Sequence, residues 1–171
     1  MPELPPDSVE VERIVRAALV TLFTGIEGLP HVLDSAVYVE GESAYVKLFG
    51  YVHDSDKKTV FRLLEIVFTD FRDGDAGCAD NPVYDLNYSL TLIVSHSPKR
   101  PAPDGLSSTD DFARLVLTMR DRALKANHLG DYERIACGNL EPRGSHFGPD
   151  ETLNLRSAHV GVFSLSVEVT P

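Results

Sequence analysis

The six histidines are the first residues to test for chemistry, because an imidazole ring can bind a metal ion or act as a general base. They stand at isolated positions: His31, His53, His96, His128, His146 and His159. No two of them have the HxH or HExxH spacing that would bring both rings onto one metal ion. The sequence His53-Asp54-Ser55-Asp56 resembles half of a calcium loop, but it lacks the glycine and the final glutamate of an EF-hand. We interpret it as a polar turn, and we expect no metal and no other cofactor.

Motifs for nucleophilic catalysis and for phosphate binding are missing from the sequence. It contains no GxSxG nucleophile elbow, no GxxxxGK[ST] loop and no GxGxxG turn. Carboxylates that could form an acid–base pair occur near one another at Asp70, Asp73 and Asp75, and at Asp110 and Asp111. The first group flanks a predicted loop and the second opens a predicted helix, so structural roles explain both groups.

One further segment, Arg143-Gly144-Ser145-His146, places a hydroxyl near an imidazole. Nucleophilic catalysis needs a third partner to orient the base, and the sequence does not place one. We therefore predict that the chain is not an enzyme. The alternative is a small-ligand-binding α+β domain, or an enzyme, with a pocket between the sheet and the helices. That alternative requires His, Arg and carboxylate side chains that converge inside the pocket.

Charge narrows the classes of partner. The 171 residues include 26 acidic and 16 basic side chains, which gives a formal net charge of −10. A surface that binds nucleic acid tightly needs clustered Lys and Arg, and so does a surface that binds anionic lipid. An acidic surface does not exclude DNA nearby, because a channel through which DNA slides without sticking should be acidic or neutral. No apolar run approaches the roughly 20 residues that span a bilayer, so we expect no membrane partner.

Length and composition fit one domain that spans residues 1–171. The apolar share of 43% and the charged share of 25% are ordinary for a globular protein. Residues 1–6 are Pro-rich and acidic, which predicts a flexible N-terminal arm and does not resemble a signal peptide. Cys78 and Cys137 are far apart and have no CxxC spacing, so we interpret them as free thiols of a reducing compartment. One disulfide between them is the alternative.

Two amphipathic helices are expected, and each has its own start signal. The first begins at residues 7–8, repeats apolar residues at i, i+3, i+4 and i+7 from Val11 to Phe23, and stops at Gly25. The second begins near residues 108–109 and carries two aspartates in its first turn, where they suit the helix dipole. Its predicted apolar stripe consists of Phe112, Leu115, Val116, Met119, Ala123 and Leu124.

Alternation of apolar and polar residues predicts the strands. The clearest alternating stretches are residues 36–39, 44–53, 87–95 and 158–169. Residues 59–71 fit a helix or a long strand. We favour the strand, because a hairpin with residues 44–53 would close across the polar turn. Gly, Pro and Asp predict loops at residues 72–86, 97–105 and 138–150.

The order of these elements predicts the fold class. It runs helix, three or four strands, helix, and then one to three strands. Strands that follow one another without helical crossovers pair mainly antiparallel. The expected fold is therefore α+β, a mainly antiparallel sheet with two amphipathic helices packed on one face.

Three segments carry a resemblance to a known family. They are the helix at residues 9–19 with the Gly28-Leu29-Pro30 break after it, the helix at residues 110–124, and the closing strand at residues 158–169. Their layout resembles that of phage tail terminator or tail-completion proteins, which cap the tail tube of long-tailed phages and of Mu-like contractile tails. Residues 54–86 and 138–157 depart from the family's layout.

The resemblance implies a structural protein of the virion, a homohexameric ring on the end of the tail tube that is assembled in the host cytoplasm. Such a ring would stop tube polymerisation and meet the neck or connector proteins, while DNA passes without specific binding. Contacts between protomers would use strand edges and long loops. Our candidate contact residues are Tyr45, Tyr51, Tyr84, Tyr88, Lys99 and Arg100. The alternative for the aromatic residues is a place in the core, and the alternative for the protein is another assembly or adaptor protein of the same class.

Overall fold

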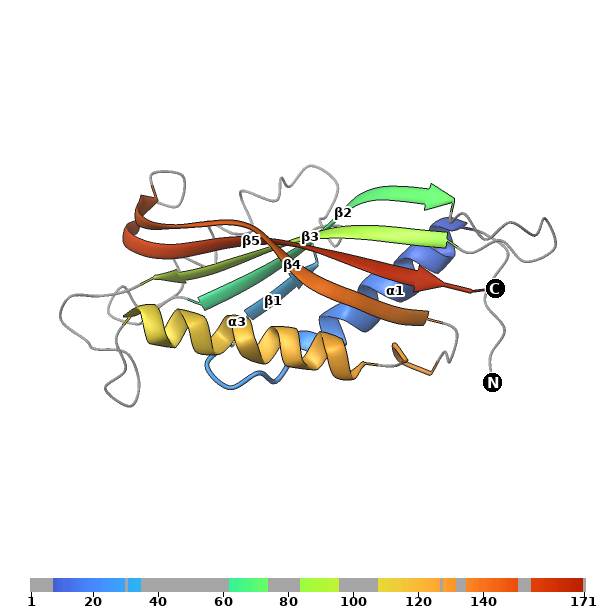
Figure 1. Ribbon diagram of the computed structural model, residues 1–171, viewed down its shortest axis with the longest axis horizontal. Coiled ribbons are helices and arrows are strands. Elements are labelled where there is room, and N and C mark those ends of the chain that lie inside the picture. Colours follow the sequence, from blue (N-terminus) through green and yellow to red (C-terminus); the bar gives the residue numbers. More distant parts are fainter. Residues whose placement is uncertain are drawn as a thin grey trace.

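The computed structural model describes residues 8–29, 31–34, 62–73, 84–95, 108–126, 128–131, 135–150 and 155–170. Its elements, in chain order, are α1 (Ser8–Phe23), β1 (His31–Asp34), β2 (Arg62–Asp73), β3 (Tyr84–Ser95), α3 (Ser108–Lys125), β4 (Ile135–Asp150) and β5 (Leu155–Val169). The strands form one sheet in the order β1-β2-β3-β5-β4, and both helices lie against the same face of it (Figure 1). The predicted α+β class, with a mainly antiparallel sheet, is confirmed.

Helix α1 has the phase that its apolar pattern predicts. Val11, Val15, Leu19 and Phe23 are buried against the sheet at a spacing of four residues. Gly25 follows with a φ of 77°, a left-handed conformation that glycine adopts without a steric penalty, and so the predicted stop is confirmed.

The end of α1 also has a partner that no local pattern predicts. Arg122 of α3 donates hydrogen bonds to the carbonyl oxygens of Leu22 at 2.9 Å, Thr24 at 2.8 Å and Gly25 at 3.2 Å. The last carbonyls of a helix have no partner within it, and a guanidinium group there also suits the helix dipole. This contact joins the two helices beneath the sheet.

Helix α3 buries a narrower stripe than predicted. Leu115, Met119 and Ala123 are almost fully buried, whereas Leu124 is 47% exposed. Leu124 lies one residue beyond Ala123, which turns its side chain by about 100° around the helix axis, away from the sheet. The prediction that placed Leu124 in the stripe is therefore wrong.

The stretch at residues 59–71, which fits a helix or a strand by sequence, forms strand β2 from Arg62 onward. Its neighbours differ from our expectation. Residues 63–66 have β1 on one side, in parallel register, and β3 on the other. The expected hairpin with residues 44–53 therefore does not occupy this part of β2, and residues 36–39 and 44–53 lie outside the described residues. Strand β1 itself had no alternating pattern long enough to predict it.

Strand β4 corrects the predicted loop at residues 138–150. This Gly- and Pro-containing segment pairs with β5 along most of its length, with register shifts at Cys137/Leu140, Pro142/Gly144 and Gly148/Asp150. Proline and glycine are tolerated because β4 is the last strand of the sheet, and because bulges absorb the residues that cannot join the ladder.

A helical crossover is the other departure from the predicted topology. Both β3 and β4 pair antiparallel with β5, which lies between them, and so β3 and β4 run parallel to each other. Helix α3 joins them across the helix-covered face. Helix α3 packs against β4 beneath the sheet (Figure 1).

Candidate functional site

The titratable residues of the described part of the chain do not gather into a metal site. Within the described ranges, no group of three or more His, Cys, Asp or Glu side chains lies close enough to hold a metal ion. None of the helices in those ranges is both long and apolar enough to cross a bilayer.

A buried charge cluster lies where β2, α3 and the turn after α1 meet. Arg62 donates to both carboxylate oxygens of Asp111, at 3.2 Å from Nη1 and 2.6 Å from Nη2, and also to the carbonyl oxygen of Gly28 at 3.2 Å. Arg114 donates to Asp111 Oδ1 at 3.1 Å. The side chain of Asp111 is 0% exposed and that of Arg62 is 5% exposed.

This cluster orients the elements around it. The carboxylate of Asp111 is held by two guanidinium groups, and its hydrogen-bonding capacity is used within the protein. The predicted place of Asp111 in the first turn of the helix is confirmed, but the sequence did not indicate a buried ion pair there. Because its oxygens contact arginine and not solvent, we assign Asp111 a structural role.

His159 forms the second cluster, with two aromatic rings. It stacks on Phe112 of α3 at 5.1 Å between ring centroids, and Phe147 of β4 lies 4.3 Å away on centroids. Gly161 makes room for this arrangement, because a Cβ there would meet Phe112 Cζ at 2.7 Å. The cluster therefore packs the start of α3 directly onto the β4–β5 pair.

The pKa of His159 makes this packing sensitive to acid. Burial lowers the pKa below its ordinary value of 6.5, and the charge of Asp111 opposes the shift in part. The folded state therefore favours the neutral ring. The contribution of His159 to stability is complete above about pH 6.5, the pKa in the unfolded chain, and is lost as the pH falls toward the folded pKa.

We expect His159→Phe to reduce the loss of stability on acidification, because the variant keeps a ring in the stack and removes the proton. Urea unfolding of wild type and variant at pH 7.5 and pH 5 measures the difference. An equal loss of unfolding free energy in both proteins would show that His159 does not carry the acid sensitivity.

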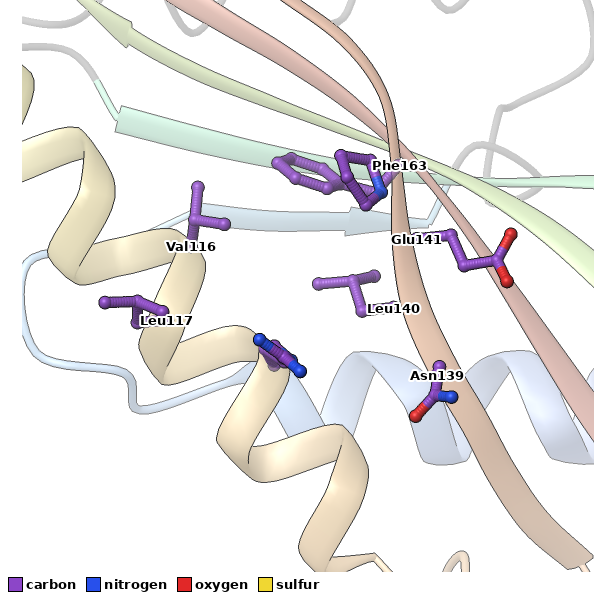
Figure 2. A pocket seen from close by; sticks show the side chains of 8 residues that line it. Val116, Leu117, Asn139, Leu140, Glu141 and Phe163 are labelled. Atoms are coloured by element: carbon purple, nitrogen blue, oxygen red, sulfur yellow. The ribbon is translucent and has the colours of Figure 1, made fainter.

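A groove with a largely apolar lining lies between α3 and β4. Its volume is about 390 Å³, and its lining is Val116, Leu117, Arg120, Asn139, Leu140, Glu141, Pro142 and Phe163. Figure 2 shows Leu117 and Val116 on the helix side, Leu140 in the middle and Phe163 behind, with Glu141 and Asn139 on β4. Leu117 is 57% exposed and Leu124, two turns further along α3, is 47% exposed.

The groove lies beside an open sheet edge. Strand β4 has β5 on one side and no further strand on the other in the described part of the chain. Unpaired edges tend to pair with other chains, and bulges, proline and charges limit this tendency. The bulges, Pro142 and the exposed pair Glu141–Arg143, which are 3.7 Å apart, have that effect on β4.

Of the six predicted contact residues, the structure describes the side chain of one. Tyr88 is fully buried in the core, with its ring edge-on to Phe68 and its hydroxyl 3.4 Å from Glu12 Oε1. It therefore does not reach a partner, and its prediction as a contact residue is corrected to the core alternative. Tyr84 lies at the start of β3, where its backbone pairs with Asp73 and Val169. The remaining four, Tyr45, Tyr51, Lys99 and Arg100, lie outside the described residues.

The other chemical candidates are dispersed. Arg143 donates from Nε to Ser164 Oγ at 2.8 Å, and His146 lies on the exposed part of β4, so no triad assembles around Ser145 within the described residues. Cys137 is a free thiol in β4, and Cys78 lies outside the described residues. Burial raises the pKa of the Cys137 thiol to about 12, so it stays protonated at neutral pH.

Leu117 and Leu124 are the surface residues that sequence reasoning missed. The sequence did carry a signal for this exposure: Leu117 follows Val116 directly, and two neighbouring apolar residues on a helix cannot both face one narrow stripe.

No protein-family model matches the chain, and no curated protein matches it in sequence. From the geometry alone, the candidate functional site is the groove between α3 and β4 together with Leu124 and the edge of β4. We call it the α3/β4 surface.

Proposed function

We propose that the chain is a structural assembly protein of a phage tail. In this proposal it acts as a tail terminator, forms a homohexameric ring on the end of the tail tube, and joins the tube to the neck. The observation that carries the proposal is the α3/β4 surface, where apolar side chains, a groove and an open strand edge lie together. Exposed apolar side chains that gather on one surface are typical of a contact with another protein.

Two further features support the proposal. The sequence layout of residues 9–30, 110–124 and 158–169 resembles that of tail terminators. The α+β class expected from the order of elements is present. The net charge of −10 suits a ring through which DNA passes without binding.

A second candidate is a small-ligand-binding domain or an enzyme, and the groove itself favours it. A volume of about 390 Å³ lies within the range of small-molecule sites. The groove is lined by Arg120 and Glu141 as its charged side chains. A ligand-binding role predicts saturable binding to a monomer, whereas an assembly role predicts a larger particle.

The experiment that separates the two is the solution mass of the purified full chain. Light scattering coupled to size exclusion measures the mass, and negative-stain images of the peak show its shape, with and without isolated tail tubes. We expect a ring of six copies, alone or on the ends of tubes. A monomer or dimer that never joins a tube contradicts the proposal and directs the search to ligands.

A further inference from the structure

We propose that the α3/β4 groove of one copy receives the start of helix α1, centred on Val9, from the next copy. This inference rests on the part of the proposed function in which copies of the chain assemble with one another. It adds the two surfaces that meet, and it makes the contact directional.

The groove is built to take an apolar side chain. Leu140 and Phe163, which are 6% and 4% exposed, form its inner surface, and Leu117 forms an open wall. An inserted side chain would cover apolar surface that water now contacts, on both partners. Burial of that kind is the main favourable term in most protein association.

The edge of β4 favours an inserted side chain over an added strand. A strand from a partner needs a regular row of backbone donors and acceptors. Two of the register shifts of β4, at Cys137/Leu140 and at Pro142/Gly144, flank the groove, and Pro142 has no N–H to donate. A regular ladder therefore cannot extend past the groove.

Val9 is the fitting counterpart on the same chain. The large exposed apolar residues of the described part are Val9, Leu117, Leu124 and Phe147. Leu117 and Leu124 belong to the α3/β4 surface, and Phe147 covers His159. Val9 is the most exposed of the four, at 64%, and it lies in the first turn of α1, a different element from the groove.

The charges beside Val9 complement those of the groove. Exposed Glu10 follows Val9, and exposed Arg13 lies one turn further along α1. The groove also carries one charge of each sign, Arg120 on α3 and Glu141 on β4. Two copies that each carry a net charge of −10 repel each other, and a contact that places cations of one copy against acids of the other offsets part of this repulsion. The proposed contact would make two such pairs, Glu10 with Arg120 and Arg13 with Glu141.

The contact is heterologous, because the protruding residue and the groove are different surfaces. Each copy then offers one groove and one exposed α1 start, and the series of contacts either closes into a ring or grows into a filament. This direction is testable by mixing two variants, each of which has lost one of the two surfaces.

The test uses Val9→Asp and Leu117→Asp in the full-length chain, under the condition that gives the wild-type ring. We expect each variant alone to run as a monomer by light scattering. When the two are mixed, the intact groove of Val9→Asp receives the intact Val9 of Leu117→Asp. Since the other two surfaces are damaged, the mixture should stop at a dimer.

Ala17→Asp, on an exposed position of α1 two turns beyond Val9, is the matched control and should still form the ring. Far-UV circular dichroism and a cooperative thermal transition check that all three variants are folded. Two outcomes overturn the inference and leave the proposed function standing: a ring formed by either Val9→Asp or Leu117→Asp alone, or a mixture that stays monomeric. A wild-type chain that forms no ring, with or without tubes, overturns both.

Discussion

Replacing Leu115 with aspartate prevents the chain from folding; this is the largest effect that we expect from a single change. Leu115 is 1% exposed and packs in the core between α3 and the sheet. An unpaired carboxylate there loses its hydration without gaining a partner, at a cost of several kcal/mol. That is comparable to the total stability of a domain, which is about 5–15 kcal/mol. Circular dichroism and thermal unfolding should show no cooperative transition.

Leu117→Asp is the matched control for this prediction, because it makes the same change on the same helix. Leu117 is 57% exposed, so its new carboxylate stays in water and the variant should still fold and unfold cooperatively. A soluble Leu115→Asp protein that melts cooperatively would show that α3 packs with a different phase.

Asp111→Ala should lower the unfolding free energy by about 3–5 kcal/mol, the usual range when one partner of a buried ion pair is removed. The variant leaves the guanidinium of Arg62, 5% exposed, without its carboxylate. It also removes the hydrogen bond from Arg114 to Oδ1 of the same carboxylate. Urea unfolding at neutral pH measures the loss.

Asp110→Ala is the control for the helix-dipole contribution. Asp110 is exposed in the same first turn, and its loss should cost less than about 1 kcal/mol. Arg62→Met combined with Asp111→Leu should recover most of the stability, because apolar side chains of similar volume often replace a buried pair without loss. If Asp111→Ala costs no more than Asp110→Ala, the buried cluster does not hold β2, α3 and the Gly28 turn together.

The helices and the central strands could be predicted from the sequence, because their signals are local. The apolar period of 3.6 residues places Val15 and Leu19 on one face of α1, and alternation places Leu90 and Leu92 on one face of β3. Gly25 ends α1 through its own backbone conformation. None of these features needs a distant residue, so the α+β class followed directly from the pattern.

The edge of the sheet could not be predicted, because its signals are ambiguous within a short window. Gly144 and Pro142 predict a loop in most settings, and only the position of β4 beside β5 makes them part of a bulged edge strand. Tyr88 likewise fits a surface contact or a core position by type. The packing of α1 over β3 decides that it is buried.

The sequence alone determined where the helices lie, which of their faces are apolar, and that the chain is acidic, since each of these depends on neighbouring residues or on a sum over the chain. The tertiary structure decided which residues meet. Asp111 pairs with Arg62 from 49 positions away, and Arg122 binds the end of α1 from about 100 positions away. The α3/β4 groove exists because the crossover helix lies beside an edge strand whose bulges and proline leave it open. Such contacts depend on the path of the whole chain through space, and spacing along the sequence does not encode that path locally.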